Sequence, residues 1–320
     1  MTIVLTASNI ENALDRDQLT DWLRAAFIDY SNQTSPRTGR FSVPVPHKDA
    51  SSVALMPGLI SGIPAFTVKV NAKFPDRRPA IQGAVLLFDL ASGDLLAIMD
   101  SACLTAIRTG EVAALAAKAL ARLDADTAAI IGAGVLGRSQ LRSLHRQRFL
   151  RKVKVFDTDS AVAERFASEL SRECETEVLR SPTLDEAVRG SGIVAIATWA
   201  TKPFFERQHL EPGMHITTLG PDAAGKGEVN ADVLRTATVV VDSRELAVSV
   251  GAIRGAGCGS DTINSELGDV LSGRSPGRTS SAEVTLFAGV GLPAQDLAAA
   301  WPIYLHARRA EIGTTIDFHA

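Results

Sequence analysis

Three glycines in the middle of the chain, Gly132, Gly134 and Gly137, constrain its fold more than any other feature. The apolar run 127–131 predicts a strand before them, and the stretch 138–149 predicts a helix after them. In such a turn the first glycine permits a sharp bend, the second lets the backbone approach a pyrophosphate, and the third lets helix pack on strand. We therefore expect a dinucleotide to bind at Gly132, Gly134, Val135, Leu136 and Gly137.

An acidic residue follows the next predicted strand. Segment 152–156 has the composition of a strand and is followed directly by Asp157. An acid at this point accepts hydrogen bonds from the adenosine ribose and repels a 2′-phosphate. The sequence therefore predicts NAD as the cofactor, with NADP as the alternative.

Helices and strands are predicted to alternate after the glycine motif, which is typical of a doubly wound parallel sheet. The expected helices cover 161–171 and 184–188, and the expected strands cover 177–179, 193–198, 215–219 and 239–241. About 120 residues precede the motif, enough for an α+β domain of their own. Its predicted elements are a helix over 18–30, strands over 53–56, 66–70 and 85–89, and an alanine-rich helix over 101–123. A final helix is predicted over 293–309.

The composition excludes several functional classes. With 320 residues, 46% of them hydrophobic, and a net charge of −3, the chain resembles a soluble globular protein without a basic field for nucleic acid. No long apolar span or signal peptide is evident, so we expect a cytoplasmic protein that does not bind membranes. Three widely spaced cysteines and six histidines without an H-x-x-x-H pair predict neither a disulfide framework nor a metal site.

Four charged residues stand in settings that plain packing does not require: Arg40, Lys69, Arg108 and Asp222. Lys69 alternates with apolar neighbours in a predicted strand, although a lysine in a strand is usually solvated. We place Arg108 at the start of the alanine-rich helix, where Thr109 would cap the helix and offer amides to a phosphate. A solvated arginine at a helix end is the alternative interpretation. Asp222 directly follows a predicted strand, where doubly wound sheets bind ligands, but a simple turn aspartate is an equal alternative.

The order of these motifs resembles the ornithine cyclodeaminase/mu-crystallin family over essentially the whole chain. The matching pieces are Leu55-Met-Pro57, Lys69, 83–89, 104–109, 130–137, 220–228, 266–270 and 286–291. The resemblance implies a Rossmann domain, over 123–295, inserted in a split α+β domain for substrate and dimerisation, over 1–122 and 296–320. It also implies a homodimer whose subunits pair through sheets.

The resemblance implies roles for particular residues. Arg40, Lys69 and Arg108 would hold a substrate carboxylate, with Met56 beside them and Arg37 as an alternative to Arg40. Asp222 corresponds to the acid/base of the cyclodeaminases, so Lys69 and Asp222 become the catalytic candidates. Lys226, Thr198 and Thr109 would contact the cofactor, the last at a phosphate.

One departure from the family pattern bears on the substrate. Cyclodeaminases carry a glutamate two residues before the Met-Pro pair, where it receives the side-chain amine of ornithine, and this chain has Ala54. A methyl group cannot bind ammonium, and an unpaired buried charge costs several kcal/mol. We therefore expect an NAD(P)H-dependent reductase of imino acids or dehydrogenase of L-amino acids, for example one acting on pyrroline-2-carboxylate. The alternatives are an ornithine cyclodeaminase and a non-catalytic, mu-crystallin-like binding protein.

Overall fold

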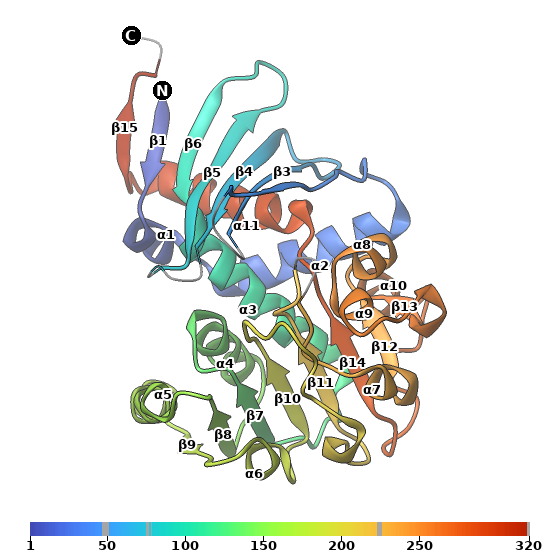
Figure 1. The fold of residues 1–320 in the computed structure, drawn as a ribbon. Helices are drawn as coiled ribbons and strands as arrows, with labels where there is room; N and C mark the ends of the chain where they lie inside the picture. The colour runs from blue at the N-terminus through green and yellow to red at the C-terminus, as the bar shows by residue number, and fades with distance from the viewer. Residues whose placement is uncertain (47–50, 75–76, 78, 223–225, 319–320) are drawn as a thin grey trace. The chain divides into compact units, whose positions relative to one another are not determined.

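The computed structural model describes residues 1–46, 51–74, 77, 79–222 and 226–318. It divides into two compact units: unit 1 is Met1–Arg108 with Leu292–Ala320, and unit 2 is Thr109–Gly291 (Figure 1). These divisions fall earlier than the boundaries expected at 122 and 295. The first lies inside a long helix, α3 (Ser101–Leu120), whose second half packs in the core of unit 2. The second precedes α11 (Pro293–Arg309), which is one continuous helix.

Unit 1 is built on one mixed sheet of seven strands, in the order β15-β1-β6-β5-β4-β3-β2. Its pairs are antiparallel except β1 with β6. The elements are β1 (Thr2–Leu5), α1 (Ala7–Ala13), α2 (Arg16–Asn32), β2 (Phe41–Pro44), β3 (Ser52–Gly58), β4 (Ala65–Lys73), β5 (Ile81–Asp89), β6 (Leu95–Asp100), the first part of α3, α11 and β15 (Thr314–Ile316).

The two faces of this sheet differ in their surroundings. Helix α11 packs on β3, β4 and β5 and also contacts α2, so one face of the sheet is covered (Figure 1). On the other face, apolar side chains from neighbouring strands remain partly exposed. One cross-strand row on that face consists of Pro57, Val68, Leu86 and Ile98, and a neighbouring row holds Phe66 stacked on Phe88 at 5.0 Å between ring centroids.

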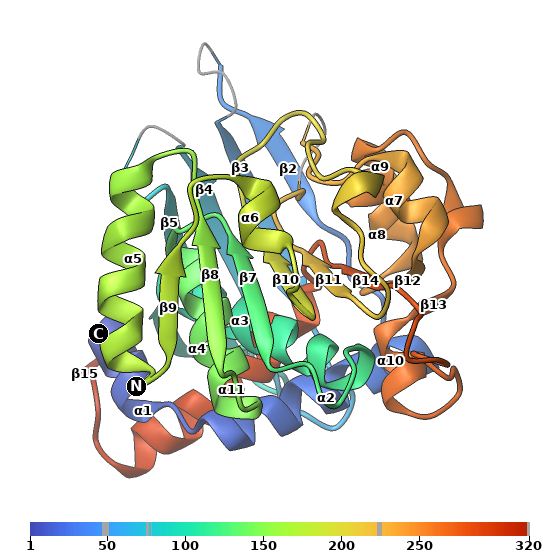
Figure 2. The same cartoon turned by 90° about the horizontal axis from the view of Figure 1, so that it is seen from below.

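Unit 2 holds eight parallel strands in the order β13-β12-β14-β11-β10-β7-β8-β9. The order runs outward in both directions from β7 and β10, so the prediction of a doubly wound parallel sheet is confirmed (Figure 2). The strands are β7 (Thr127–Ile131), β8 (Lys152–Phe156), β9 (Glu177–Arg180), β10 (Ile193–Ile196), β11 (His215–Thr218), β12 (Thr238–Val241), β13 (Ser265–Glu266) and β14 (Thr285–Ala288).

Helices cover both faces of the sheet in unit 2. They are α4 (Val135–Gln147), α5 (Ser160–Glu173), α6 (Leu184–Val188), α7 (Ala231–Thr236), α8 (Arg244–Ser249), α9 (Ala252–Gly255) and α10 (Leu267–Leu271), with short 3₁₀ turns at Arg207–His209 and Ser260–Thr262. Successive residues of a strand point to opposite faces. Thus Ile131 packs with α6 to α9 in one core, while Ile130 packs with α3, α4 and α5 in a second. Within the described ranges, no helix is long and apolar enough to span a bilayer.

Candidate active site

The glycine turn of unit 2 joins β7 to α4 in the predicted way. Gly132 has a φ of +101°, and a Cβ there would collide with the carbonyl oxygen of Ala197, just after β10. A Cβ on Gly137 would collide with the carbonyl oxygen of Gly132. Both glycines are therefore required by the protein's own packing, and they hold the turn at the carboxyl ends of β7 and β10.

Gly134 differs from these two glycines. Its φ is −78°, an ordinary value, and a Cβ would meet no protein atom within 4 Å. Neither backbone strain nor internal packing explains a glycine here, whereas close approach of a ligand does. No side chain caps α4 at Gly134. The open space and the uncapped amides fit the pyrophosphate of a dinucleotide.

Asp157 lies beside the glycine turn. Its Oδ2 accepts a hydrogen bond from the amide of Ala133 at 2.8 Å, and its Oδ1 accepts one from the amide of Asp159 at 3.0 Å. The carboxylate is thus fixed at the end of β8, next to the turn that follows β7. The Thr158 hydroxyl also donates to Oδ1 at 3.5 Å, and Oδ2 keeps a second lone pair for a ribose hydroxyl.

Glu228 is a buried acid that was not predicted as a site residue. Its carboxylate accepts hydrogen bonds from the amide and the hydroxyl of Thr198, at 2.6 and 2.8 Å, and from the hydroxyl of Thr218 at 2.6 Å. Burial raises the pKa of Glu228, while these hydrogen bonds oppose the rise. Glu228 therefore connects the segment after β10 to the end of β11, and it uses the amide and hydroxyl hydrogens of Thr198 to do so.

Asp222 and Lys226 pair with each other in the loop after β11. Lys226 Nζ lies 3.0 Å from Asp222 Oδ1 and 4.2 Å from the centre of the Trp199 ring. Both charged groups are mostly shielded, with side-chain exposures of 23% and 15%. Residues 223–225 of the predicted loop 220–228 lie outside the described residues.

A row of polar side chains crosses the covered face of the sheet in unit 1. Thr67, Lys69 and Asn71 alternate along β4 and are all buried. Lys69 is paired in register with Met56 on β3 and Val85 on β5, both buried and apolar. Burying polar groups costs free energy unless they have hydrogen-bond partners. This row of residues therefore indicates that the face has a role besides packing.

Lys69 and Arg108 meet at an internal carboxylate that was not predicted, Asp296 in the first turn of α11. Lys69 Nζ lies 2.6 Å from Asp296 Oδ2, and Arg108 Nε lies 3.1 Å from Asp296 Oδ1. Arg108 also donates from Nη1 to Gln295 Oε1 at 2.7 Å. The side chain of Asp296 is fully buried, and those of Lys69 and Arg108 are 2% and 7% exposed.

The pKa of Lys69 is lowered to about 8. Burial is the main cause, Arg108 and Arg40 add to it, and the adjacent Asp296 opposes it. Arg40 therefore lies close enough to act on Lys69 electrostatically, whereas the Arg37 guanidinium stacks over the Tyr30 ring at 4.7 Å. Of the two arginines, this contrast favours Arg40 as the one belonging to the Lys69 cluster.

The expected position of Arg108 and Thr109 at a helix start is wrong. Helix α3 begins at Ser101, directly after β6, where Asp100 accepts a hydrogen bond from the amide of Cys103 at 2.7 Å. Asp100 thus caps the first turn, and Arg108 lies two turns further on. The amide of Thr109 is inside the helix and is used by its hydrogen-bond ladder. Only the Thr109 hydroxyl is left for a phosphate, so the predicted amide contact is withdrawn.

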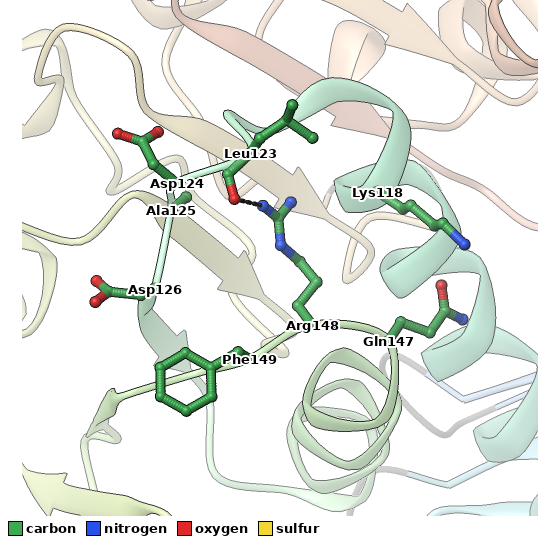
Figure 3. A pocket seen from close by; sticks show the side chains of 8 residues that line it. All are labelled: Lys118, Leu123, Asp124, Ala125, Asp126, Gln147, Arg148 and Phe149. Atoms are coloured by element: carbon green, nitrogen blue, oxygen red, sulfur yellow. Dashed lines mark hydrogen bonds between the residues drawn. The ribbon is translucent and has the colours of Figure 1, made fainter.

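A surface hollow of about 430 Å³ lies at the amino ends of the strands in unit 2, away from the glycine turn (Figure 3). It is lined by Lys118, Leu123, Asp124, Ala125, Asp126, Gln147, Arg148 and Phe149. Arg148 donates to the carbonyl oxygen of Leu123 at 3.2 Å. Because these residues precede β7 and β8, the hollow is at the amino ends of the strands, whereas doubly wound sheets bind ligands at the carboxyl ends. Among the described residues, no cluster of three or more potential metal ligands occurs.

Comparisons with known proteins cover both units. The model of the ornithine cyclodeaminase/mu-crystallin family matches residues 1–311. The mouse protein named ketimine reductase mu-crystallin is 32% identical over 83% of this chain and 83% of its own length. The Δ1-pyrroline-2-carboxylate reductase of Thermococcus litoralis, solved with NADH and L-proline, is 28% identical with a TM-score of 0.93, covering 98% of this chain and 100% of that one. An archaeal alanine dehydrogenase dimer with bound NAD is 28% identical with a TM-score of 0.92, covering 99% of each chain.

Proposed function

The chain belongs to the ornithine cyclodeaminase/mu-crystallin family, and we propose that it is an NAD(P)H-dependent oxidoreductase acting on a C=N bond next to a carboxylate. The observation that carries this proposal is the buried cluster of Lys69, Arg108 and Asp296. Two cations share one carboxylate, so the cluster keeps a net positive charge in a desolvated place. An unpaired buried charge is costly, and an anionic substrate group relieves that cost.

The residues of unit 1 have distinct roles in this proposal. Arg108 and Arg40 hold the substrate carboxylate, where a guanidinium is able to donate two parallel hydrogen bonds. Lys69, with its pKa near 8, donates a proton to the imine nitrogen and recovers it from solvent close to neutral pH. Met56 supplies the apolar wall beside Lys69. Asp222 of unit 2 is the second proposed acid/base group.

The residues of unit 2 hold the dinucleotide. Gly132, Gly134, Val135, Leu136 and Gly137 form the pyrophosphate site, and Asp157 accepts the ribose hydroxyls. Thr109, Thr198 and Lys226 are further proposed contacts. When bound, the nicotinamide supplies the hydride. The two 28% identical neighbours solved with NADH or NAD support NAD as the cofactor, and Asp157 favours it over NADP.

The substrate proposed is a small imino acid with an uncharged side chain. Ala54 is 2% exposed, lies on the same face of β3 as Met56 and pairs with Asn71. This position therefore offers no carboxylate to a side-chain ammonium, which disfavours ornithine and hence the cyclodeaminase reaction. A cyclic imine such as pyrroline-2-carboxylate, whose reduction gives proline, brings a carboxylate and no second charge.

A substrate screen tests the proposal. Purified protein with NADH is given pyrroline-2-carboxylate, 2-keto acids with ammonia or methylamine, and, with NAD⁺, L-proline, L-alanine and L-ornithine, while the nicotinamide absorbance is followed. Lys69→Met and Arg108→Met should each lower kcat/KM for the best substrate by about a hundredfold or more. The exposed Lys118→Met is the matched control and should leave it unchanged. Absence of turnover with every substrate would favour the binding protein, and release of ammonia from ornithine would favour the cyclodeaminase.

We extend the proposal to assembly and location. The partly exposed apolar face of the unit 1 sheet suits pairing with a second copy, and one structural neighbour is described as a dimer. All three cysteines are free, in keeping with a reducing compartment such as the cytoplasm.

A further inference from the structure

The first turn of α11 holds two buried polar residues to which the proposed function assigns no contact with substrate or cofactor. Gln295 is 1% exposed and Asp296 is 0% exposed, and both contact Arg108. Helix α11 is otherwise buried mainly through alanine, leucine and other apolar side chains. An amide and a carboxylate at such positions are costly unless their hydrogen-bonding groups are used.

The contact with Arg108 fixes the orientation of the Gln295 amide. A guanidinium has five donor hydrogens and no acceptor, so the atom that faces Arg108 Nη1 at 2.7 Å must be the amide oxygen. The amide nitrogen, Nε2, then points elsewhere with two donor hydrogens. It is buried and has no hydrogen-bond partner among the described residues.

An unsatisfied buried donor costs about 1–3 kcal/mol. A ligand oxygen that accepts a hydrogen bond from Nε2 would remove this cost. The neighbouring cations favour a ligand with a negative charge. Nε2 belongs to the same amide that touches Arg108, and Arg108 and Lys69 share Asp296. Two cations and an unused amide donor in one cluster together form a site for an anion with more than one acceptor oxygen.

Asp296 sets the geometry and charge of that cluster. Its two oxygens contact different cations, Lys69 at 2.6 Å and Arg108 at 3.1 Å, although these belong to a strand and a helix. Without this carboxylate the two cations would repel each other with no counter-charge between them. The ammonium of Lys69 would then lose the interaction that opposes its desolvation.

We propose that Gln295 is a substrate-binding residue, donating from Nε2 to the substrate carboxylate, and that Asp296 is a positioning residue that holds Lys69 and Arg108 toward that carboxylate and keeps Lys69 protonated. This assignment rests on the proposed function for the identity of the ligand. Its two parts have readouts that do not require turnover.

The test of Asp296 is the titration of Lys69. Protein labelled with ¹³C at the lysine ε-carbon is titrated by NMR, and the Lys69 signal is identified by its absence in Lys69→Arg. In Asp296→Asn the Lys69 pKa should fall by about 1–3 units below its wild-type value. In Asp296→Glu it should return toward that value, and the exposed Asp21→Asn is the matched control. A change below about 0.5 unit in a folded Asp296→Asn would overturn the positioning role.

Activity adds a second readout for Asp296. With the best screened imine, the pH at which kcat/KM falls for lack of the protonated form should move down in Asp296→Asn by the same interval as the Lys69 pKa. A residue that only supports the fold would lower kcat/KM at all pH values without moving this limb.

The test of Gln295 uses its own side-chain amide. In ¹⁵N-labelled protein with NAD⁺, the Gln295 NH₂ signals, identified by their absence in Gln295→Met, should shift downfield on addition of L-proline and stay unchanged with L-prolinamide. Gln295→Met should raise KM for pyrroline-2-carboxylate about tenfold or more while changing kcat by less than about threefold. Equal shifts with both ligands, or an unchanged KM, would overturn the binding role.

If Asp296→Asn does not fold, this wild-type experiment still decides for or against Gln295. If wild type turns over nothing in the screen, the proposed function fails, while the Lys69 titration stands or falls separately.

Discussion

Asp157 is the residue on which the choice of cofactor depends. Its oxygens are held by the amides of Ala133 and Asp159, so the carboxylate has little freedom to turn away from the proposed ribose position. A 2′-phosphate at that place would meet a fixed negative charge.

We expect NADH to be preferred, and Asp157→Ser to narrow or reverse the preference. The serine keeps a hydrogen-bonding group but removes the charge that repels a 2′-phosphate. The measurement is kcat/KM with NADH and with NADPH for both proteins. A wild-type preference for NADPH of tenfold, about 1.4 kcal/mol in the opposite direction, would refute the assignment.

His215 is a buried base with no place in the proposed chemistry. Its ring nitrogens lie 3.0 Å from Thr285 Oγ1 and 3.1 Å from Thr217 Oγ1. Burial lowers its pKa to about 3, and the positive charges of Arg278 and Arg148 contribute. In the unfolded chain the imidazole of His215 is protonated near pH 6.5, whereas in the folded chain it is protonated only near pH 3. Stability from this residue is therefore present above pH 6.5 and is lost as the pH falls toward 3.

The pH dependence of urea unfolding should reveal this linkage. Between pH 7 and pH 5 the wild type should lose about 2 kcal/mol through His215. In His215→Gln, which remains neutral, the loss over the same interval should be smaller by that amount, whatever the stability at pH 7. The exposed His306→Gln is the control and should retain the wild-type slope. An unchanged slope in His215→Gln would mean that this imidazole is protonated in the folded protein.

Of the residues in the proposed site, the sequence pointed to those whose types stand out locally and missed those whose importance depends on tertiary contacts. Lys69 interrupts an apolar strand and Arg108 precedes a run of alanines, so both were visible. Asp296 lies 188 residues from Arg108, inside a segment that reads as an ordinary helix start. Glu228 is similar, since the sequence does not reveal that this loop glutamate is buried and accepts four hydrogen bonds.

At the scale of elements, periodicity predicted the long helices, because one buried face repeats often enough to be recognised. Short apolar runs predicted six of the eight parallel strands of unit 2, β7 to β12. The strands β1, β2, β6, β13, β14 and β15 were not predicted, since segments of two to six residues often give too weak a pattern. The range predicted for α3 begins at the observed Ser101, but Arg108 and Thr109 were wrongly assigned to the start of this helix. Asp100 is the last residue of β6 as well as the cap of α3, so no turn separates the two elements.

The β7–α4 turn offers a matched pair of glycine substitutions. Gly134→Ala places a methyl group in open space, so the protein should fold with stability within about 0.5 kcal/mol of wild type. The same methyl group would occupy space needed by a pyrophosphate, so NADH should bind at least about tenfold more weakly. Gly137→Ala should instead lower the stability of the fold, because its methyl group meets the Gly132 carbonyl.

Thermal unfolding and NADH fluorescence titration separate these two effects. Normal NADH affinity in Gly134→Ala would remove the pyrophosphate from this turn. Normal stability in Gly137→Ala would show that α4 shifts away from β7 at little cost.

At the scale of the whole molecule, the partly exposed apolar face of the unit 1 sheet is the basis for expecting a dimer. Pro57, Val68, Leu86 and Ile98 form a continuous apolar row across β3, β4, β5 and β6, and each remains partly or largely exposed. Large exposed apolar patches on soluble proteins mark interaction sites. A second copy of the chain presents the same face, so a two-fold axis through the sheets would cover both.

We therefore expect a homodimer that a single charge on this face weakens. Leu86→Lys places an ammonium in the middle of the row, where a dimer would desolvate it and a monomer would leave it in water. The folded monomer should thus tolerate the change, while the dimer dissociation constant should rise about a hundredfold or more, equivalent to about 2.7 kcal/mol. Light scattering at micromolar concentration measures the mass, and circular dichroism checks the fold. Asn32→Lys, an exposed site at the end of α2, adds the same charge elsewhere and should remain dimeric. A monomeric wild type, or a Leu86→Lys protein that dimerises as tightly as wild type, would place the subunit contact on another surface.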